Sequence, residues 1–237
     1  MVRPGKIGFG WSLRKHAFEK WGRAINRKKL GTQPIFKNFF RVGKSQLVRR
    51  IVENRNELWR TPIKHCFYIY SMYQSHFSDM QKNCENVHFF HLFDHEQLER
   101  LDDYPNCLVI CDDVYDQAPP NWIKNFYVQR SHHSSINFLS IYHSMFDQKD
   151  KNMRVCSLNT QIQFLMSSPR SVDQIYTFAR QLFPNSSKSF VKLYEEICSI
   201  PFTYLCINLH AQYPAFLRIT SHIIPPDGPI RVYELNK

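Results

Sequence analysis

The sequence lacks any apolar run that approaches the roughly 18 residues a membrane-spanning helix needs, so no transmembrane helix is expected. The first residues, MVRPGKIGFGWSLRKHAF, are basic but lack the long apolar core of a secretory signal. We therefore expect an intracellular protein that is not secreted and has no membrane partner. Hydrophobic residues make up 43% of the 237 positions, enough for a globular α/β domain with a sizeable core.

The cysteines do not form an even set, which argues against a disulfide framework. There are seven, and Cys66, Cys107, Cys111 and Cys206 fall in apolar runs typical of strands. Cys107 and Cys111 lack a second Cys/His pair at the spacing of zinc ligands. We therefore expect reduced, buried cysteines, as in intracellular proteins.

Acidic residues are scarce at the start of the chain. Residues 1–60 hold 16 Lys/Arg against three acids, whereas the remainder holds 15 against 17. This imbalance predicts a polyanionic partner, DNA or RNA, although a nuclear targeting segment or a solvated helix would look the same. Residues 11–29 have the spacing of a basic amphipathic helix, which could equally dock on another protein. We divide the chain into a basic extension, 1–33, and a main domain, 34–237.

Helix and strand patterns alternate along the main domain. Helix patterns occur at residues 44–57, 120–128, 171–182 and 188–198. Strand patterns occur at residues 65–70, 87–90, 107–113, 136–142, 161–167, 203–210, 216–220 and 229–235. The alternation predicts an α/β fold with a mostly parallel central sheet and helices on both faces. The continuous apolar run at 107–113 suits a central strand that is buried on both sides.

Gly43-Lys44-Ser45 opens the helix predicted at 44–57, and the same tripeptide closes a phosphate-binding loop. In such a loop the lysine reaches the β- and γ-phosphates, the hydroxyl ligates Mg²⁺, and the helix dipole favours the anion. The tripeptide alone is a weak signal, and the full pattern needs a glycine where this chain has Asn38. The short segment before it, IFKNFF, is a poor first strand.

The strand predicted at 107–113 ends in Asp112 and Asp113, as a Walker B element does. There the first acid holds the Mg²⁺ shell and the second orients or deprotonates the attacking water. A strand followed by an Asp-rich turn would look the same. Both motifs in this order favour a P-loop NTPase that uses ATP and Mg²⁺, bound through Gly43, Lys44, Ser45 and Asp112, with Asp113 catalytic.

Several further stretches resemble the genome-packaging ATPases of Polinton/Maverick transposons and adintoviruses. These belong to the FtsK–HerA group of P-loop NTPases and are related to the poxvirus packaging ATPase. The resemblance covers residues 34–224, and its most specific motifs lie within 130–184: Arg130-x-His132-His133, Ser157-Leu158-Asn159, Pro169-Arg170 and Ala179-Arg180-Gln181-Leu182-Phe183-Pro184.

The resemblance implies a RecA-like (ASCE) fold and an oligomeric ring that pumps double-stranded DNA into a capsid with ATP. It implies further partners in copies of the chain and a capsid protein, and a location in the nucleus or virion. His143 matches a family Gln that senses the γ-phosphate. Arg130, Arg180 and Arg218 are candidates for an arginine finger across a subunit boundary, although salt-bridged structural arginines are commoner.

The phosphate loop departs from that family, whose members have Gly-Pro-Thr-Gly-Ser-Gly-Lys-Ser/Thr after a hydrophobic strand. Here IFKNFF passes directly into RVGKS. Phe39, Phe40 and Val42 cannot cheaply supply the positive φ and close backbone approach that glycines give a phosphate. We therefore expect weak or absent ATP binding. A misassembled gene model, a decayed transposon copy and true divergence each explain the shortened loop.

Two rivals follow from the residues. A non-enzymatic relic would keep the fold and bind DNA or protein through residues 1–60. The retained Lys44, Ser45, Asp112 and Asp113 argue against long decay, because an idle site has no physical need for adjacent acids at a strand end. Another P-loop enzyme, a helicase or a small-molecule kinase, is a weaker rival. Hydrolysis stimulated by DNA distinguishes the motor from the kinase.

Overall fold

The computed structural model describes residues 43–93, 98, 100–130, 136–142, 151–167 and 172–236. The predicted basic extension, the segment before Gly43, and His143 lie outside these residues. The described part of the chain begins at Gly43 and contains the helices and strands that follow it.

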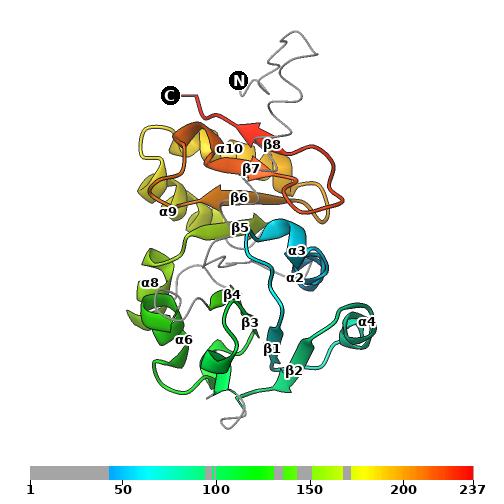
Figure 1. The fold of residues 1–237 in the computed structure, drawn as a ribbon. Coiled ribbons are helices and arrows are strands. Elements are labelled where there is room, and N and C mark those ends of the chain that lie inside the picture. Colours follow the sequence, from blue (N-terminus) through cyan, green and yellow to red (C-terminus); the bar gives the residue numbers. More distant parts are fainter. Residues whose placement is uncertain are drawn as a thin grey trace.

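Four strands form a parallel sheet, as the sequence predicted. They are β1 (Cys66–Tyr70), β2 (Val87–His91), β3 (Leu108–Asp112) and β4 (Asn137–Ile141). Their order across the sheet is β2-β1-β3-β4, and every pairing is parallel (Figure 1). The register aligns Tyr70 and Ile141 with Asp112, so the three strands end together at one edge. β3 is buried at all five residues, as expected for a central strand.

Helices cover both faces of this sheet, which confirms the predicted α/β class. One face packs against α2 (Lys44–Glu53), α3 (Arg55–Leu58) and α4 (His76–Asn83). The other face contacts residues of η1 (Arg100–Asp103), η2 (Tyr115–Gln117), α6 (Trp122–Asn125), η3 (Phe126–Arg130) and α8 (Lys151–Leu158). Successive side chains of a strand point to opposite faces, so Tyr68 and Ile110 join the first core while Phe67 and Val109 join the second.

A second sheet is antiparallel, with the order β5-β6-β7-β8. Its strands are β5 (Ile162–Met166), β6 (Tyr204–Asn208), β7 (Ile219–Ser221) and β8 (Arg231–Tyr233), and η5 (Ala215–Leu217) precedes β7. One face packs against α9 (Val172–Leu182) and α10 (Ser187–Cys198). The sequence did not predict this direction of pairing, because a buried strand pattern reads the same in parallel and antiparallel sheets.

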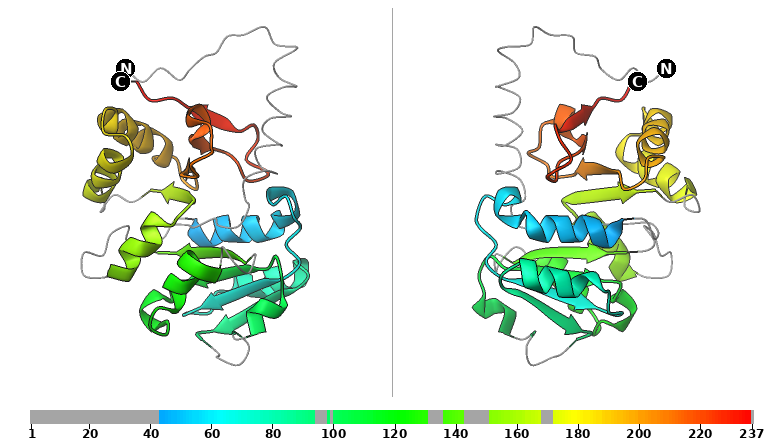
Figure 2. Two further views of the ribbon diagram at one scale, coloured as in Figure 1. Left: turned by 60° about the vertical axis from the view of Figure 1, so that its left-hand side comes forward. Right: turned by 90° about the vertical axis from the view of Figure 1, so that its right-hand side faces the viewer.

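Helix α2 lies where the two sheets meet (Figure 2). Its apolar stripe, Leu47, Val48, Ile51 and Val52, belongs to one core cluster with residues of both sheets. Burying each such side chain stabilises the fold by about 1.5–3 kcal/mol. On the solvent side, Arg50 pairs with Asp227 at 2.6 Å, just before β8. Helix α2 is therefore fixed to the antiparallel sheet as well as the parallel one.

Several elements differ from the predicted ones. The helix predicted at 44–57 breaks at Asn54, whose amide donates to the Arg50 carbonyl at 2.8 Å. Helices α4 and α8 escaped prediction, because α4 buries only Phe77 and Met80 and so shows little periodicity. No helix among the described residues is long and apolar enough to span a membrane.

All seven cysteines are free and buried, which confirms that prediction. Burial raises the pKa of the Cys66, Cys107 and Cys206 thiols to about 12, so these side chains stay protonated and unreactive. Their role in this fold is that of small apolar residues in the core.

Candidate phosphate and metal site

Gly43 begins α2 with a left-handed backbone, φ +96° and ψ 0°. Its carbonyl accepts the first helical hydrogen bond from Leu47 N at 2.8 Å. A Cβ at this position would lie 3.0 Å from Met166 Cε and 3.0 Å from Phe202 Cδ1, so both conformation and space favour glycine. The first turn carries no acidic residue. The positive end of the helix dipole therefore adds to the charge of Lys44.

Lys44 is the one buried lysine among the described residues, with 7% of its surface exposed. Burial lowers the pKa of its ammonium group, and the carboxylates of Asp112 and Asp113 oppose that shift. The two acids act on Lys44 because α2 begins next to the edge where β3 ends. The fold thus brings together two motifs that are far apart in the sequence.

Asp112 is the last residue of β3 and is buried. Its Oδ2 accepts hydrogen bonds from Tyr68 Oη at 2.8 Å and from Gln74 Nε2 at 3.2 Å. Burial, and then the Asp112 charge, raise the pKa of the Tyr68 phenol well above its ordinary value, so it remains a donor. The carboxylate is thereby held in one orientation toward the start of α2.

Sequence reasoning missed these two donors. Tyr68 packs with its ring centroid 4.9 Å from that of Phe77, but its hydroxyl also reaches Asp112. The contact depends on the strand register. Tyr68 pairs with Ile110, and Asp112 lies two residues further along β3, on the same face of the sheet as Ile110 and Tyr68.

Asp113 follows β3 directly and is exposed, with φ +56°. Its left-handed backbone turns the chain sharply at the edge of the sheet, and Asp is one of the residues that tolerate this conformation. Ser45 is half-buried in the first turn of α2. A buried and an exposed carboxylate thus stand side by side near one lysine.

The residues present suit a magnesium ion by the chemistry of their donors. Mg²⁺ prefers hard oxygen ligands, usually one or two carboxylates together with waters and substrate phosphates. Asp112 supplies such a carboxylate, and Ser45 supplies a hydroxyl.

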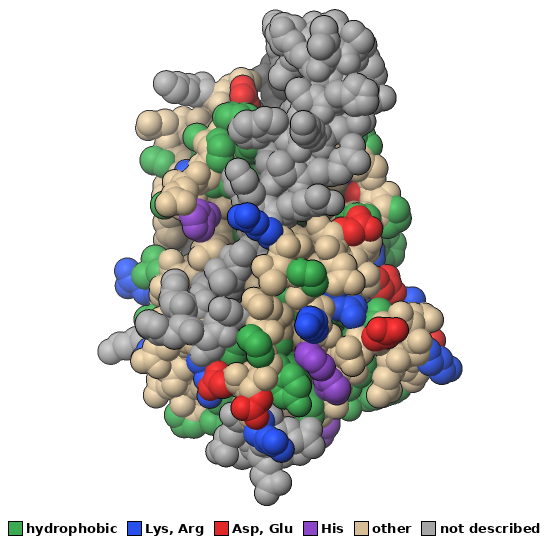
Figure 3. Space-filling view, viewed as in Figure 1, with side chains coloured by type: hydrophobic (Ala, Val, Ile, Leu, Met, Phe, Trp, Pro, Cys, Tyr) green, Lys and Arg blue, Asp and Glu red, His purple; other side chains and the backbone are tan. Residues whose placement is uncertain are grey.

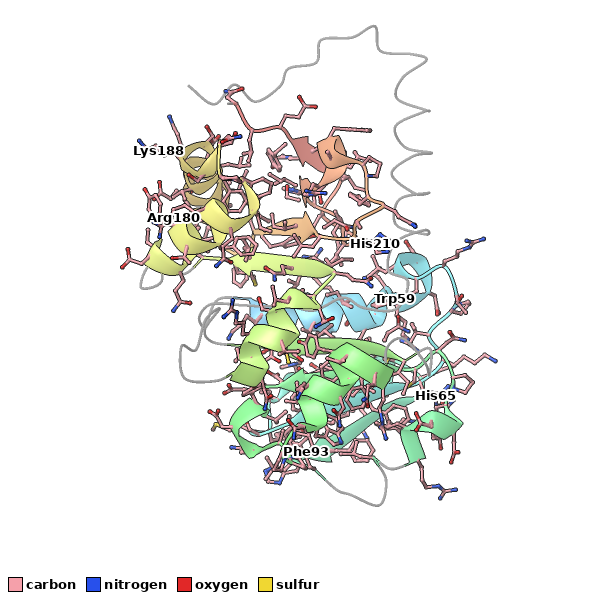
Figure 4. The ribbon with its side chains drawn as sticks, turned by 90° about the vertical axis from the view of Figure 1, so that its left-hand side faces the viewer. Trp59, His65, Phe93, Arg180, Lys188 and His210 are labelled. Atoms are coloured by element: carbon pink, nitrogen blue, oxygen red, sulfur yellow. The ribbon has the colours of Figure 1, made fainter. Side chains whose placement is uncertain are left out.

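The candidate arginine fingers lie apart from this site. Arg130 ends η3, where it contacts Asp102 at 3.7 Å and lies 5.2 Å from the centroid of the Phe126 ring. Arg180 is exposed on α9, outside the antiparallel sheet (Figure 4). These positions fit the structural interpretation of Arg130 and leave Arg180 on an outer surface.

Arg218 precedes β7, where its carbonyl accepts a hydrogen bond from Asn208 N at 2.9 Å. Asn208 is four strand steps from Tyr204, or about 13 Å, and the Tyr204 end of β6 is the one that pairs with Met166 near Gly43. Arg218 is therefore at the opposite end of the antiparallel sheet from the Gly43 end, within one chain.

No protein-family model matches the sequence, and no curated protein matches it. Among solved structures, the chain is similar to the cytoplasmic domain of EssC, with 15% sequence identity and a TM-score of 0.41. The similarity covers 60% of this chain and 32% of that one, so the chain spans less than two thirds of its length.

Proposed function

We propose that this chain is a P-loop ATPase whose phosphate site is formed by the start of α2 and the end of β3. The observation that carries the proposal is that buried Lys44, at the start of α2, lies near Asp112 and Asp113, at the end of β3. A buried ammonium group beside two acids at the carboxyl edge of a parallel sheet is costly for stability. Ionisable side chains with a perturbed pKa are commonly found at catalytic and binding sites.

Each side chain has a distinct task in this proposal. The Lys44 ammonium and the first N–H groups of α2 hold the phosphates, and Gly43 lets the backbone approach them. Ser45 and Asp112 hold Mg²⁺, which supplies charge neutralisation at the phosphates when it is bound. Asp113, which is exposed, orients the attacking water and accepts its proton. Tyr68 and Gln74 fix the orientation of Asp112.

We further propose that the ATPase moves double-stranded DNA as an oligomeric ring, in a virus-like transposon or virus. The resemblance to packaging ATPases supports this role, as does the net charge of +8 on the basic extension, residues 1–33 (nine Lys/Arg minus one acid). On the face seen in Figure 3, the described basic side chains are mixed with acidic ones rather than gathered in a stripe. The basic extension is therefore the segment we assign to DNA.

A second candidate function is non-enzymatic binding of DNA or protein through residues 1–60. This second function is favoured by Asn38, which occupies a position where a phosphate-binding loop needs glycine. A loop that lacks several backbone donors loses much of its affinity for a triphosphate. In the ATPase we therefore expect weak nucleotide binding.

The test is Mg²⁺–ATP binding and hydrolysis by the purified full chain, with and without double-stranded DNA. Lys44→Ala should lower kcat/KM about 100-fold or more, as expected for loss of a charge that stabilises the transition state. Lys188→Ala is the matched control, because Lys188 is exposed on α10, away from α2 (Figure 4).

The outcomes separate the candidate functions. Turnover that DNA stimulates and that only Lys44→Ala removes supports the motor. Turnover that ignores DNA favours another P-loop enzyme, such as a kinase. DNA binding that weakens steeply with salt, without ATP binding above the Lys44→Ala level, overturns the ATPase and favours the non-enzymatic function.

A further inference from the structure

A phenylalanine projects into solvent beside the candidate phosphate site. Phe202 lies in the turn between α10 and β6 and is 63% exposed, although it is a large apolar residue. Its Cα is 3.6 Å, and its Cδ1 3.0 Å, from the point where a Gly43 Cβ would stand. The ring therefore borders the residue that precedes Lys44.

The backbone of this turn does not favour phenylalanine. Thr203 N donates to the Ile200 carbonyl at 3.3 Å, Pro201 takes the second position, and Phe202 takes the third with φ +63°. A turn with proline second and positive φ third is of type II, and its third position is normally glycine or asparagine. Glycine adopts this conformation without the strain that a Cβ brings, so the backbone at Phe202 is locally strained. Such strain clusters at ligand-binding sites.

The turn is also held firmly in place. Thr203 Oγ1 donates to the Ile200 carbonyl at 2.8 Å and also contacts the Ile197 carbonyl at the end of α10. Tyr194 Oη, from the same helix, donates to the Met166 carbonyl at 2.8 Å. The backbone next to Phe202 is thus tied to the end of α10, and α10 is tied to the end of β5.

The start of α2 therefore has two different neighbours. Asp112 and Asp113, at the end of the parallel sheet, act on Lys44 and suit a metal with phosphates. Phe202, next to the antiparallel sheet, offers an exposed aromatic face, and Ile200 adds a second apolar side chain that is 52% exposed. A ligand with a charged end and a flat aromatic end would match both.

We propose that Phe202 is the base-stacking residue of the nucleotide site, with the base of a nucleoside triphosphate lying on its ring. The proposal rests on the function proposed above. Every nucleobase has an aromatic face, so a site that relies on stacking accepts different bases with similar affinity. We therefore expect ATP and GTP to bind comparably.

The experiment compares binding of Mg²⁺–ATP and of Mg²⁺–tripolyphosphate, which has no base, to the full chain by calorimetry. Phe202→Ala should weaken ATP binding about 10-fold and leave tripolyphosphate binding unchanged. Phe202→Trp should retain ATP binding. Phe202→Gly should weaken ATP binding as Ala does, while raising the unfolding midpoint, because glycine suits the turn. Phe216→Ala, at another exposed phenylalanine, on η5, is the matched control and should change neither ligand.

Failure of each proposal gives a distinct result. If the wild-type chain binds both ligands and Phe202→Ala weakens both equally, Phe202 supports Gly43 rather than the base, and the inference is overturned. The inference is also overturned if Phe202→Ala binds both ligands as the wild-type chain does, or if it changes only the oligomeric state. If the wild-type chain binds neither ligand, the proposed phosphate site fails, and the stacking role fails with it.

Discussion

One buried tyrosine supports the hydrogen-bonded part of the contact between α2 and the antiparallel sheet. The Tyr204 hydroxyl donates to Asp227 Oδ2 at 2.6 Å and accepts from Ile223 N at 2.9 Å and Ile224 N at 3.0 Å. The same aspartate binds Arg50 of α2 through its other oxygen. Tyr204→Phe removes three hydrogen bonds at once and keeps the ring that fills the core.

The expected cost follows from those three bonds. A hydrogen bond to a charged group is worth about 1.5–3 kcal/mol, and a neutral one about 0.5–1.5 kcal/mol. Ile223 is half-buried, so water can replace the acceptor for its N–H, whereas Ile224 is buried. We therefore expect Tyr204→Phe to lower the free energy of unfolding by about 3 kcal/mol.

Equilibrium unfolding in urea measures this loss, and Tyr233→Phe is the matched control. The Tyr233 hydroxyl shares a single hydrogen bond with Ser221 Oγ at 2.9 Å, so its removal should cost about 1 kcal/mol. Equal costs for the two variants would refute the assignment of Tyr204 as the anchor of α2. A Tyr204→Phe protein of wild-type stability would refute it more strongly.

Three further changes test other parts of the structure. Gly43→Ala should lower the free energy of unfolding more than Gly228→Ala does. Both glycines have positive φ, which costs a residue with a Cβ about 1–2 kcal/mol, but only at Gly43 would the Cβ also meet close neighbours. Equal unfolding free energies for the two variants would contradict this. Burial, foremost, and nearby arginines lower the pKa of His222, so folding stability should be lost as pH falls through about 6.5; urea midpoints at pH 7.5 and 5.5 should differ less in His222→Asn. Trp59→Phe should cost about 1–3 kcal/mol by thermal unfolding, because the buried Asn137 loses the indole donor at 2.9 Å; no change would show that this bond is dispensable.

The sequence predicted the parallel part of the fold well, because its strands carry unbroken apolar runs. The run at 107–113 became β3, buried throughout, and the helix after Gly43 became α2. The antiparallel sheet could not be predicted, since pairing direction depends on contacts that no local pattern encodes. Short helices such as α4, with two buried side chains, lack the periodicity that prediction needs.

The charged residues of the candidate site could be predicted from the sequence, but the uncharged side chains around them could not. Lys44 and Asp112 belong to motifs whose order along the chain implies that they meet, and the structure places them close. Tyr68 and Phe202 carry no such signal. The first matters because of strand register, and the second because of a turn whose strain appears only in the backbone angles. The roles of His143 and of an arginine finger from a neighbouring subunit stay predictions.

Helix α2 has a consequence for how the chain responds to a ligand. Because its apolar stripe belongs to a core shared by both sheets, α2 cannot unfold without exposing apolar surface on each of them. The two sheets should therefore melt as one cooperative unit. A phosphate compound bound at the first turn would raise the melting temperature of the whole unit, by an amount set by its concentration relative to Kd. Even a weak ligand could then be detected as a concentration-dependent shift in that single transition.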